Sequence, residues 1–333
     1  MSGRILVVGG AGYIGSHMVK LLLAQGEEPL VLDDLSSGHR DAVLPGAIFV
    51  QGSSGDGALL ARLFRRYGID TVTHFASSIN VGESVTHPGR YYDNNVCNTL
   101  TLLNAMAAHG IAHFVFSSTA AIFGHPRAPL IDERHPQLPI NPYGRSKWLI
   151  EQLLPDYENA YRMRHVCLRY FNAAGADPDG MLGERHEPET HLIPLALRAA
   201  MGGGPLPLYG DDYGTPDGSC IRDYVHVADL CGAHLLAIRR LRAGMPSAAF
   251  NLGNGNGYSV REVLRAVERV VGRPCPVQIA PRRKGDPARL VADASKAREL
   301  LGWTPAYPAL EDIVTHAFRW EAAQEEHCAQ AAG

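Results

Sequence analysis

Tyr143 and Lys147 lie four residues apart in a helix predicted over about 143–161, directly after the turn at 139–142. Residues four apart share one face of a helix, so the phenol and the ammonium would lie side by side. Thr119 follows the apolar run at 111–116, at the carboxyl end of a predicted strand, where open α/β sheets place their ligands. We therefore expect the three side chains to converge on one reacting group.

A tyrosine, a lysine and a hydroxyl together suit alcohol–ketone chemistry. Because an ordinary tyrosine titrates near pH ~10, Tyr143 needs nearby positive charge to act as a base at neutral pH. Lys147 and an oxidised nicotinamide would both supply it, and the Thr119 hydroxyl would help to pass the proton while a cofactor takes a hydride. A Tyr-x-x-x-Lys pair alone is common on ordinary helices, so its position after a nucleotide-binding sequence is what favours catalysis.

That nucleotide-binding sequence contains Gly9, Gly12 and Gly15, directly after the apolar run at 5–8. A continuous apolar run is typical of a buried parallel strand, and the glycines let the backbone turn tightly and approach a pyrophosphate. The run at 18–23 then opens a helix, whose N-terminal amides favour negative charge. The pattern predicts a dinucleotide site.

Two acidic residues sharpen the choice of cofactor. Asp33 and Asp34 end the next predicted strand, about 20 residues beyond the glycines. An acid at this place accepts hydrogen bonds from the adenosine ribose of NAD, whereas it would repel the 2′-phosphate of NADP. The sequence therefore favours NAD.

Short β-rich runs alternate with helical stretches through the first half of the chain, which is the rhythm of a parallel sheet covered by helices. The predicted elements are strands at 5–8, 29–33, 47–50, 70–75, 111–116 and 165–170, and helices near 16–24, 57–67, 91–109 and 143–161. We expect an α/β fold, a doubly wound parallel (Rossmann) sheet with a smaller, interleaved C-terminal α/β substrate domain.

From residue 175 onward Gly and Pro become more frequent, so the strands are expected to be short and separated by loops. Residues 1–175 are predicted to form the NAD-binding domain, with a return segment at 224–252, where a strand-then-helix pattern resumes. Residues 176–223 and 253–333 are predicted to form the substrate-binding domain.

Composition limits the partners. The 333 residues are 46% hydrophobic and can bury a large core, and a formal net charge of −3 provides no basic field for nucleic acid or a membrane surface. The sequence has neither a signal-like segment nor a long apolar run, so we expect a cytoplasmic protein. Its six cysteines form no CxxC pair or metal-like cluster, so neither disulfides nor a metal site is predicted.

Several longer motifs point to one family. They are Gly-Gly-Ala-Gly-Tyr-Ile-Gly-Ser-His at 9–17, Val-Gly-Glu-Ser-Val at 81–85, Tyr-Tyr-Asp-Asn-Asn-Val at 91–96, Ser-Ser-Thr-Ala-Ala at 117–121, Asn-Pro-Tyr-Gly-Arg-Ser-Lys at 141–147, Arg-Tyr-Phe-Asn at 169–172 and Arg-Asp-Tyr-Val-His-Val at 222–227. By these motifs the chain resembles, over nearly its whole length, the extended short-chain dehydrogenase/reductase family with its NAD-dependent epimerases and dehydratases.

The resemblance implies an isomerase that interconverts UDP-galactose and UDP-glucose, with a place in galactose metabolism. NAD would stay bound while a hydride leaves C4 of the UDP-hexose and returns to the opposite face of a 4-keto sugar. Tyr143 would be the base, Thr119 its hydrogen-bonding helper and Lys147 a ligand of the nicotinamide ribose. The resemblance also suggests a homodimer formed by the helices at 91–109 and 143–161.

The same match implies the remaining site residues. The implied cofactor contacts are Gly9, Gly12, Tyr13, Ile14, Gly15, Asp33, Asp34, Phe75, Ala76, Asn94, Lys147 and Phe171. The implied UDP-sugar contacts are Thr119, Tyr143, Asn172, His191, Tyr209, Arg222, Arg283 and Asp286. The chemistry agrees for the arginines, because a planar guanidinium can grip diphosphate oxygens bidentately.

The chain departs from the family pattern at a few positions. Ser53 stands where the family often has an Asp facing adenine, with Asp56 as a candidate substitute, and Ile79 replaces a Lys that some members carry. Leu290 stands where members restricted to UDP-glucose and UDP-galactose have a bulky aromatic residue. A smaller side chain there leaves room for an N-acetyl group, so UDP-GlcNAc and UDP-GalNAc join the expected substrates.

Three alternatives stay open at this point. A UDP-pentose 4-epimerase needs the same reacting groups. A nucleotide-sugar 4,6-dehydratase shares the cofactor and the Tyr/Lys pair, but its relatives carry acidic residues where Ala120 and Ala121 follow Thr119 here. An NAD-binding sensor without turnover is disfavoured, because such proteins usually lack the Tyr-Lys pair.

Overall fold

The computed structural model describes residues 3–283 and 286–332. Its centre is a sheet in the order β11-β6-β5-β4-β1-β2-β3, in which every neighbouring pair is parallel. The strands are β1 (Arg4–Val8), β2 (Leu30–Asp33), β3 (Ile48–Gln51), β4 (Ile69–His74), β5 (His113–Thr119), β6 (Arg164–Tyr170) and β11 (Ala248–Leu252). The predicted doubly wound parallel sheet is confirmed, and its strand order reverses between β1 and β4, where such folds bind ligands.

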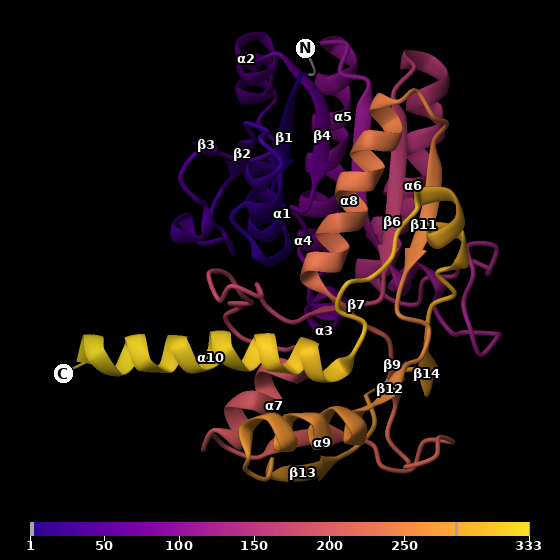
Figure 1. Ribbon diagram of the computed structural model, residues 1–333. Helices are drawn as coiled ribbons and strands as arrows, with labels where there is room; N and C mark the ends of the chain where they lie inside the picture. Colours follow the sequence, from indigo (N-terminus) through magenta and orange to yellow (C-terminus); the bar gives the residue numbers. More distant parts are fainter. Residues whose placement is uncertain (1–2, 284–285, 333) are drawn as a thin grey trace.

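Alternate residues of each strand serve two cores, because successive side chains point to opposite faces of a sheet. Ile5 and Val7 of β1 pack with α1 (Tyr13–Ala24) and α8 (Val227–Arg242), while Leu6 and Val8 pack on the other face. The helices on that other face are α2 (Gly57–Tyr67), α5 (Asn98–Ala108) and α6 (Pro142–Tyr161). The apolar strands are therefore covered by helices on both faces (Figure 1).

Smaller sheets and the helices that pack with them lie beyond the carboxyl ends of these strands, in the lower half of Figure 1. The strand pairs are β10 (Tyr224–His226) with β7 (Asn172–Ala174), β8 (Leu206–Tyr209) with β13 (Val277–Ala280), and β9 (Ile221–Arg222) with β12 (Tyr258–Ser259) and β14 (Arg289–Leu290). Helices α7 (Leu192–Ala200), α9 (Val260–Val271) and α10 (Leu310–Ala332) share a third core. Among the described residues, no helix is both long and apolar enough to span a membrane.

The chain returns to the large sheet late in the sequence. After β10 it continues into α8, which packs on the sheet, and β11 then pairs in parallel with β6 from Ala248↔Val166 to Leu252↔Tyr170. The division into an NAD-binding and a substrate-binding domain at these boundaries stays a prediction.

The helix predicted at 91–109 differs in its details. It follows α3 (Val81–Thr86) and consists of α4 (Pro88–Tyr91), a π-helical turn at Tyr92–Cys97 and then α5. Asn95, 2% exposed, lies in the π turn, and its side chain hydrogen-bonds the backbone of Ser78 and the hydroxyl of Ser146. An extra residue in the turn widens it, which accommodates this buried amide, a long-range contact that helical spacing does not reveal. Short helical turns also occur at Arg40–Ala42, Ala120–Phe123 and Ala297–Leu301.

A buried ion pair joins α6 to β5 and β6. Glu151 and Arg169 are 7% and 5% exposed, the Arg169 Nε lies 3.0 Å from a Glu151 carboxylate oxygen, and the Ser118 hydroxyl donates to the same carboxylate. Because Ser118 precedes Thr119, this contact fixes the strand end on which the predicted chemistry depends.

Replacing Glu151 by Ala is expected to lower the free energy of unfolding by about 3–5 kcal/mol, since it leaves the Arg169 guanidinium buried and unpaired. Urea unfolding followed by circular dichroism measures the change. Glu158→Ala is the control on the same helix, because that side chain is 34% exposed and its ion pair with His165 spans 3.6 Å; we expect it to cost under about 1 kcal/mol. Equal losses in the two variants would contradict the structural role of Glu151.

Candidate active site

The local sequence begins α6 beside the turn that follows β5. The side-chain oxygen of Asn141 accepts the Gly144 N–H at 2.8 Å, which caps the helix, and Pro142 fits the first helical position. Residue 144 must be glycine at this approach, because a Cβ there would lie 2.4 Å from the Ala121 carbonyl oxygen. The first turn of α6, which carries Tyr143, is thereby held against the end of β5.

Lys147, one turn further along α6, is buried at 3% exposure. Its Nζ donates to Ser77 Oγ at 2.6 Å and to the Ser117 carbonyl oxygen at 2.9 Å, and it lies 5.0 Å from the centroid of the Phe116 ring. Within the part of the chain that the structure describes, no carboxylate forms an ion pair with it. Burial lowers the pKa of Lys147 from its ordinary value near 10.5 to about 7.

In the cofactor-free structure, burial is the largest influence on the Tyr143 phenol, and its tuning by Lys147 together with an oxidised nicotinamide stays a prediction. Burial raises the pKa of Tyr143 above its usual value, and a side-chain hydrogen bond with Thr119 offsets this only in part. Ser77 and the Ser117 carbonyl oxygen accept the hydrogen bonds of the Lys147 Nζ. Thr119 and Tyr143 are nonetheless brought together as predicted from the sequence, while their catalytic roles stay a prediction.

The low pKa of Lys147 has a consequence for stability in the cofactor-free protein. Between about pH 7 and pH 10.5 the unfolded chain binds a proton at this lysine that the folded chain does not, so the group adds stability as pH rises. Lys147→Met removes this contribution. We expect wild type to gain about 1.4 kcal/mol per pH unit relative to the variant across this window.

Urea unfolding at pH 7, 8 and 9 measures that difference. Lys296→Met is the control, because Lys296 is a partly exposed lysine outside the site whose Nζ donates to the Ala249 carbonyl oxygen. A constant difference between wild type and Lys147→Met over this range would contradict the neutralised lysine.

The glycine turn after β1 has the geometry that a dinucleotide needs. Gly9 has φ +80°, and a Cβ there would lie 2.5 Å from the Ala76 nitrogen, while a Cβ on Gly15 would lie 2.0 Å from the Gly9 carbonyl oxygen. At Gly12 a Cβ would meet nothing closer than 3.5 Å, so this face of the turn is open. No side chain caps α1, and its first turn carries no acidic residue, which leaves its amides available to a pyrophosphate. These residues fit the cofactor.

Asp33 fixes the same turn from the end of β2. It is 8% exposed, and its carboxylate oxygens accept the Ala11 N–H at 2.9 Å and the Leu35 N–H at 2.8 Å. Burial raises the pKa of Asp33, and these hydrogen bonds oppose the rise. The Asp34 carboxylate accepts the Ser36 N–H at 2.9 Å. Each carboxylate oxygen of Asp33 has a second lone pair left for a ribose hydroxyl.

Other implied cofactor residues surround the carboxyl ends of the strands. Phe75 follows β4 and its ring centroid lies 4.6 Å from that of His234, and the Ala76 N–H donates to the Val8 carbonyl oxygen at 3.2 Å. Asn94 Nδ2 donates to the Ser78 hydroxyl at 3.2 Å. Their contact with NAD stays a prediction.

Three more of these residues are held by the protein itself. The Tyr13 hydroxyl donates to the Gly175 carbonyl oxygen, and Ile14 packs against the core that contains α8. Phe171, 9% exposed, belongs to a small cluster beneath the site, with Leu290 packed against it.

At the adenine end, Asp56 has a structural task. Its carboxylate accepts the Leu59 N–H at 2.9 Å as the N-cap of α2, and Ser53 Oγ accepts the Gly55 N–H at 3.0 Å. The Asp56 carboxylate therefore has a structural role as a helix cap that requires no ligand.

The implied UDP-sugar residues of the smaller part come together in pairs. Arg222 forms an ion pair with Asp286, and the Arg283 guanidinium lies 4.0 Å from the centroid of the Tyr209 ring. Arg222 is also next to Leu290, because β14 pairs with β9 in the register Leu290↔Arg222. Two guanidinium groups in one region suit a diphosphate.

Asn172 and its neighbour strand are fixed by a buried aspartate. Both the backbone N–H and the side-chain amide of Asn172 donate to the Asp223 carbonyl oxygen, at 3.1 and 2.9 Å. The Asp223 carboxylate, fully buried, accepts the N–H groups of Asn254, Gly255 and Ala292. Asp223 therefore anchors the strand that carries Arg222.

His191 belongs to a group that the sequence reasoning missed. It stands at the N-cap position of α7 without a capping side-chain hydrogen bond, and its Nδ1 lies 2.6 Å from Glu184 Oε1 and 3.3 Å from Glu189 Oε1, with His186 beside it. Its predicted contact with the UDP-sugar stays a prediction. Burial opposes the charge of both imidazoles, but the two carboxylates outweigh it and raise the pKa of His186 to about 9 and of His191 to about 10. The expectation of no metal site rested on the cysteines alone. The alternating Glu and His residues at 184–191 are a sequence pattern that could have indicated candidate metal ligands.

Ser77, Glu151 and Arg169 were also missed as parts of the site. The sequence does not mark these residues as parts of the site, because the role of a serine or of an ion pair depends on a partner that is distant in the sequence. Among the side chains that the structure describes, the cysteines with free thiols are Cys97, Cys167, Cys220, Cys231 and Cys275.

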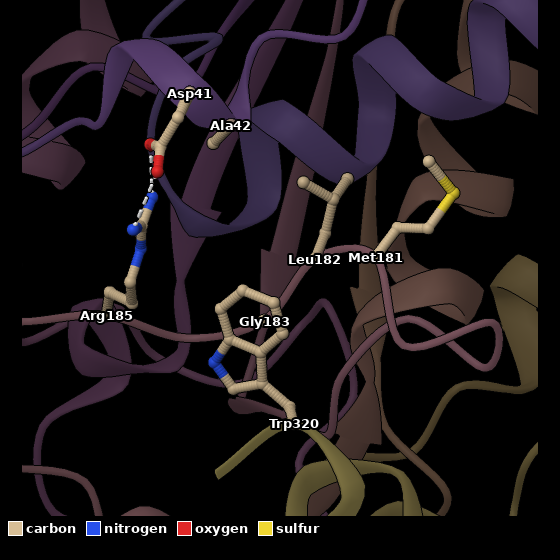
Figure 2. A pocket seen from close by; sticks show the side chains of 7 residues that line it. All are labelled: Asp41, Ala42, Met181, Leu182, Gly183, Arg185 and Trp320. Carbon is tan, nitrogen blue, oxygen red and sulfur yellow. Dashed lines mark hydrogen bonds and ion pairs between the residues drawn. The ribbon is translucent and has the colours of Figure 1, made fainter. Parts of the chain in front are cut away.

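A small cavity of about 60 Å³ lies beside the segment at 181–185 (Figure 2). Trp320 of α10 and the segment at 181–185 form one side of it, and Asp41 and Ala42 form the other, with Asp41 paired to Arg185. None of the predicted catalytic residues lines it.

Comparison with known proteins agrees with this geometry. The model of the NAD dependent epimerase/dehydratase family matches residues 5–253, and the chain belongs to this family.

Within this family, the similar proteins include several UDP-hexose 4-epimerases. The UDP-glucose 4-epimerase of Halalkalibacterium halodurans is 53% identical over 317 residues, which cover 95% of each chain. The crystal structure of UDP-glucose 4-epimerase from Brucella ovis in complex with NAD is 49% identical, with a TM-score of 0.93 over 96% of this chain and 99% of that one. The UDP-Glc/GlcNAc 4-epimerase of Campylobacter jejuni is 44% identical, with a TM-score of 0.85 over 97% of this chain and 100% of that one.

Proposed function

We propose that the chain interconverts UDP-galactose and UDP-glucose by epimerisation at C4, with NAD as a tightly bound cofactor. The observation that carries the proposal is that Thr119, at the carboxyl end of β5, and Tyr143, in the first turn of α6, are brought together one helical turn from the buried Lys147. Two further observations support the proposal. The glycine turn at the same edge of the sheet is open, and UDP-glucose 4-epimerases share about half of their residues with this chain.

In this proposal Tyr143 holds and moves the proton of the sugar's fourth hydroxyl. Thr119 orients the phenol and shares its proton, and Lys147 fixes the floor of the site through Ser77 and the Ser117 carbonyl oxygen. When bound, NAD supplies a hydride acceptor and donor, together with a positive charge that favours the phenolate. The amides at the start of α1 would hold its pyrophosphate and Asp33 its adenosine ribose.

Arg222, Arg283 and Tyr209 would bind the UDP part of the substrate. The guanidinium groups match diphosphate oxygens and the ring offers a stacking face, while Asp286 holds Arg222 in place. Asn172 would contact the sugar, because it stands next to Phe171 at the end of β6.

The 4,6-dehydratase reaction fits the site less well, because it needs an additional acid. Ala120 and Ala121 follow Thr119, and Ala120 is 2% exposed. The buried carboxylate that accepts from the neighbouring Ser118, Glu151, is already paired with Arg169.

Proton NMR of the purified protein with UDP-galactose tests the proposal. We expect UDP-glucose to form until both sugars reach equilibrium, without added NAD. Bound NAD without turnover of UDP-galactose, or of UDP-xylose and UDP-arabinose, would favour the sensor and reject the epimerase. Turnover of the pentoses alone would select the UDP-pentose alternative.

We also propose that the site admits N-acetylated sugars. Leu290 packs against the cluster that contains Phe171 and lies in register with Arg222, so it borders the proposed sugar site. The relative from Campylobacter jejuni carries both UDP-Glc and GlcNAc in its name. Assays with UDP-GlcNAc and UDP-GalNAc decide the matter, and no turnover of either would reject the wider pocket.

We propose that the chain works as a homodimer in the cytoplasm. Helices α5 and α6 pack side by side, joined by a hydrogen bond from the Tyr157 hydroxyl to Asn104, and they leave Leu100 and Tyr161 36% and 58% exposed. Two copies could bury this face. Light scattering after gel filtration measures the mass, and a monomer at micromolar concentration would reject the dimer.

A further inference from the structure

Four metal-ligating side chains converge in the segment between β7 and α7. One ligand atom each of Glu184, His186, Glu189 and His191 lies within 4.8 Å of all the others. His186 Nδ1 is 3.1 Å from Glu184 Oε1 and 3.8 Å from Glu189 Oε2, and His191 Nδ1 is 2.6 Å and 3.3 Å from oxygens of the same carboxylates. Both imidazoles thus direct the same nitrogen toward the same pair of carboxylates.

These atoms are buried without good hydrogen bonds. Glu184 is 4% exposed and the Glu189 side chain 1% exposed. Glu184 Oε1, His186 Nδ1, Glu189 Oε2 and His191 Nδ1 are all shielded from solvent, and none has a hydrogen-bond partner of acceptable geometry. Ion pairs between these imidazoles and carboxylates balance the charges, but they leave four buried polar atoms around one point without well-directed hydrogen bonds. Buried polar atoms of this kind call for an explanation, and a common ion would satisfy all four once it displaced the imidazole protons.

The donor set and its spacing indicate the class of that partner. Imidazole and carboxylate ligands bind Zn²⁺ at about 2.0–2.2 Å, and a tetrahedron of such bonds places neighbouring ligand atoms roughly 3.3–3.5 Å apart. The four nitrogen–oxygen distances, from 2.6 to 3.8 Å, scatter around this value. Two carboxylates also balance the charge of a divalent ion when both histidines are neutral.

We propose that Glu184, His186, Glu189 and His191 bind one divalent transition-metal ion of the zinc class. With four protein ligands, the site is of the closed, structural type rather than a catalytic one. It lies where the smaller part of the protein meets α1 and α10, because the His186 ring lies 6.4 Å from that of Tyr13 and Trp320 Nε1 donates to the Glu184 carbonyl oxygen at 3.2 Å. The ion would fasten this segment and the start of α7.

Metal analysis of the tag-free, full-length protein tests the proposal. After treatment with a chelator, the protein is dialysed against Zn²⁺ and then against metal-free buffer, and its zinc is measured by mass spectrometry. We expect about one ion per chain, a melting temperature several degrees above that of the metal-free form, and the visible absorption of a four-coordinate ion when Co²⁺ replaces Zn²⁺. Wild type that retains no metal and shows no such absorption would overturn the site.

Variants locate the ion. His186→Ala and Glu184→Gln are expected to lower the Zn²⁺ affinity by at least about 100-fold, because each of four ligands carries roughly a quarter of the binding. Arg185→Ala is the matched control in the same segment, since Arg185 pairs with Asp41 outside the cluster (Figure 2), and it should bind within about twofold of wild type. Circular dichroism verifies that each variant is folded. Zinc that binds equally well to wild type and His186→Ala would place the ion elsewhere and leave the four side chains as an ion-pair cluster only.

Discussion

Tyr143→Phe is expected to lower kcat for UDP-galactose by about 10²–10⁴-fold, the contribution typical of a positioned acid–base group. The change removes one oxygen and keeps the ring, so the packing of α6 against the turn at Ala121 is preserved. NAD content should not change, because neither the glycine turn nor Asp33 is touched. Coupled measurement of UDP-glucose formation gives the rate, and absorbance of the nucleotide released by denaturation gives the cofactor content.

Tyr157→Phe is the matched control for this variant. Tyr157 lies on the same helix and is 9% exposed, and its hydroxyl donates to Asn104 at 2.6 Å rather than to a residue of the site. We expect its kcat to stay within about twofold of wild type, at a cost to stability of about 1 kcal/mol for the lost hydrogen bond. Similar rates for Tyr143→Phe and Tyr157→Phe would remove Tyr143 from the reaction.

Gly15→Ala has the second large expected effect, a loss of bound NAD and a fall of more than about 3 kcal/mol in the free energy of unfolding. A Cβ at residue 15 would lie 2.0 Å from the Gly9 carbonyl oxygen and 2.8 Å from Gly10 Cα. Since both are backbone atoms, the whole turn must move. Alanine alone would favour the helix by about 1 kcal/mol, so any loss reports the steric conflict.

Gly232→Ala provides the control for this argument. Gly232 lies inside α8, and a Cβ there would meet nothing within 4 Å, so alanine should leave stability unchanged or raise it by up to about 1 kcal/mol. Thermal unfolding and the NAD content of both variants are compared with wild type. Full NAD content in Gly15→Ala would show that the turn can rearrange, and the close packing inferred here would not be required for the cofactor.

Some parts of the site are determined by neighbours in the sequence. The apolar run at 5–8, its glycines and the helix that follows define a strand, a turn and an open helix N-terminus through local backbone preferences alone. Asn141, Pro142 and Gly144 similarly specify where α6 begins, so Tyr143 and Lys147 could be placed on one helix face. The parallel sheet follows from the alternation of such units, and family membership from the longer motifs.

Other properties depend on residues that are distant in the sequence, and only the tertiary structure decided them. Ser77 and the Ser117 carbonyl oxygen accept the hydrogen bonds of the Lys147 Nζ, and burial is the largest influence on the pKa of Tyr143. The π turn at 92–97 accommodates the buried side-chain amide of Asn95, which hydrogen-bonds Ser78 and Ser146. The sequence determined the local elements because short-range sterics and hydrogen bonds suffice for them, whereas desolvation and long-range contacts, which control the charges, arise only when the chain is packed.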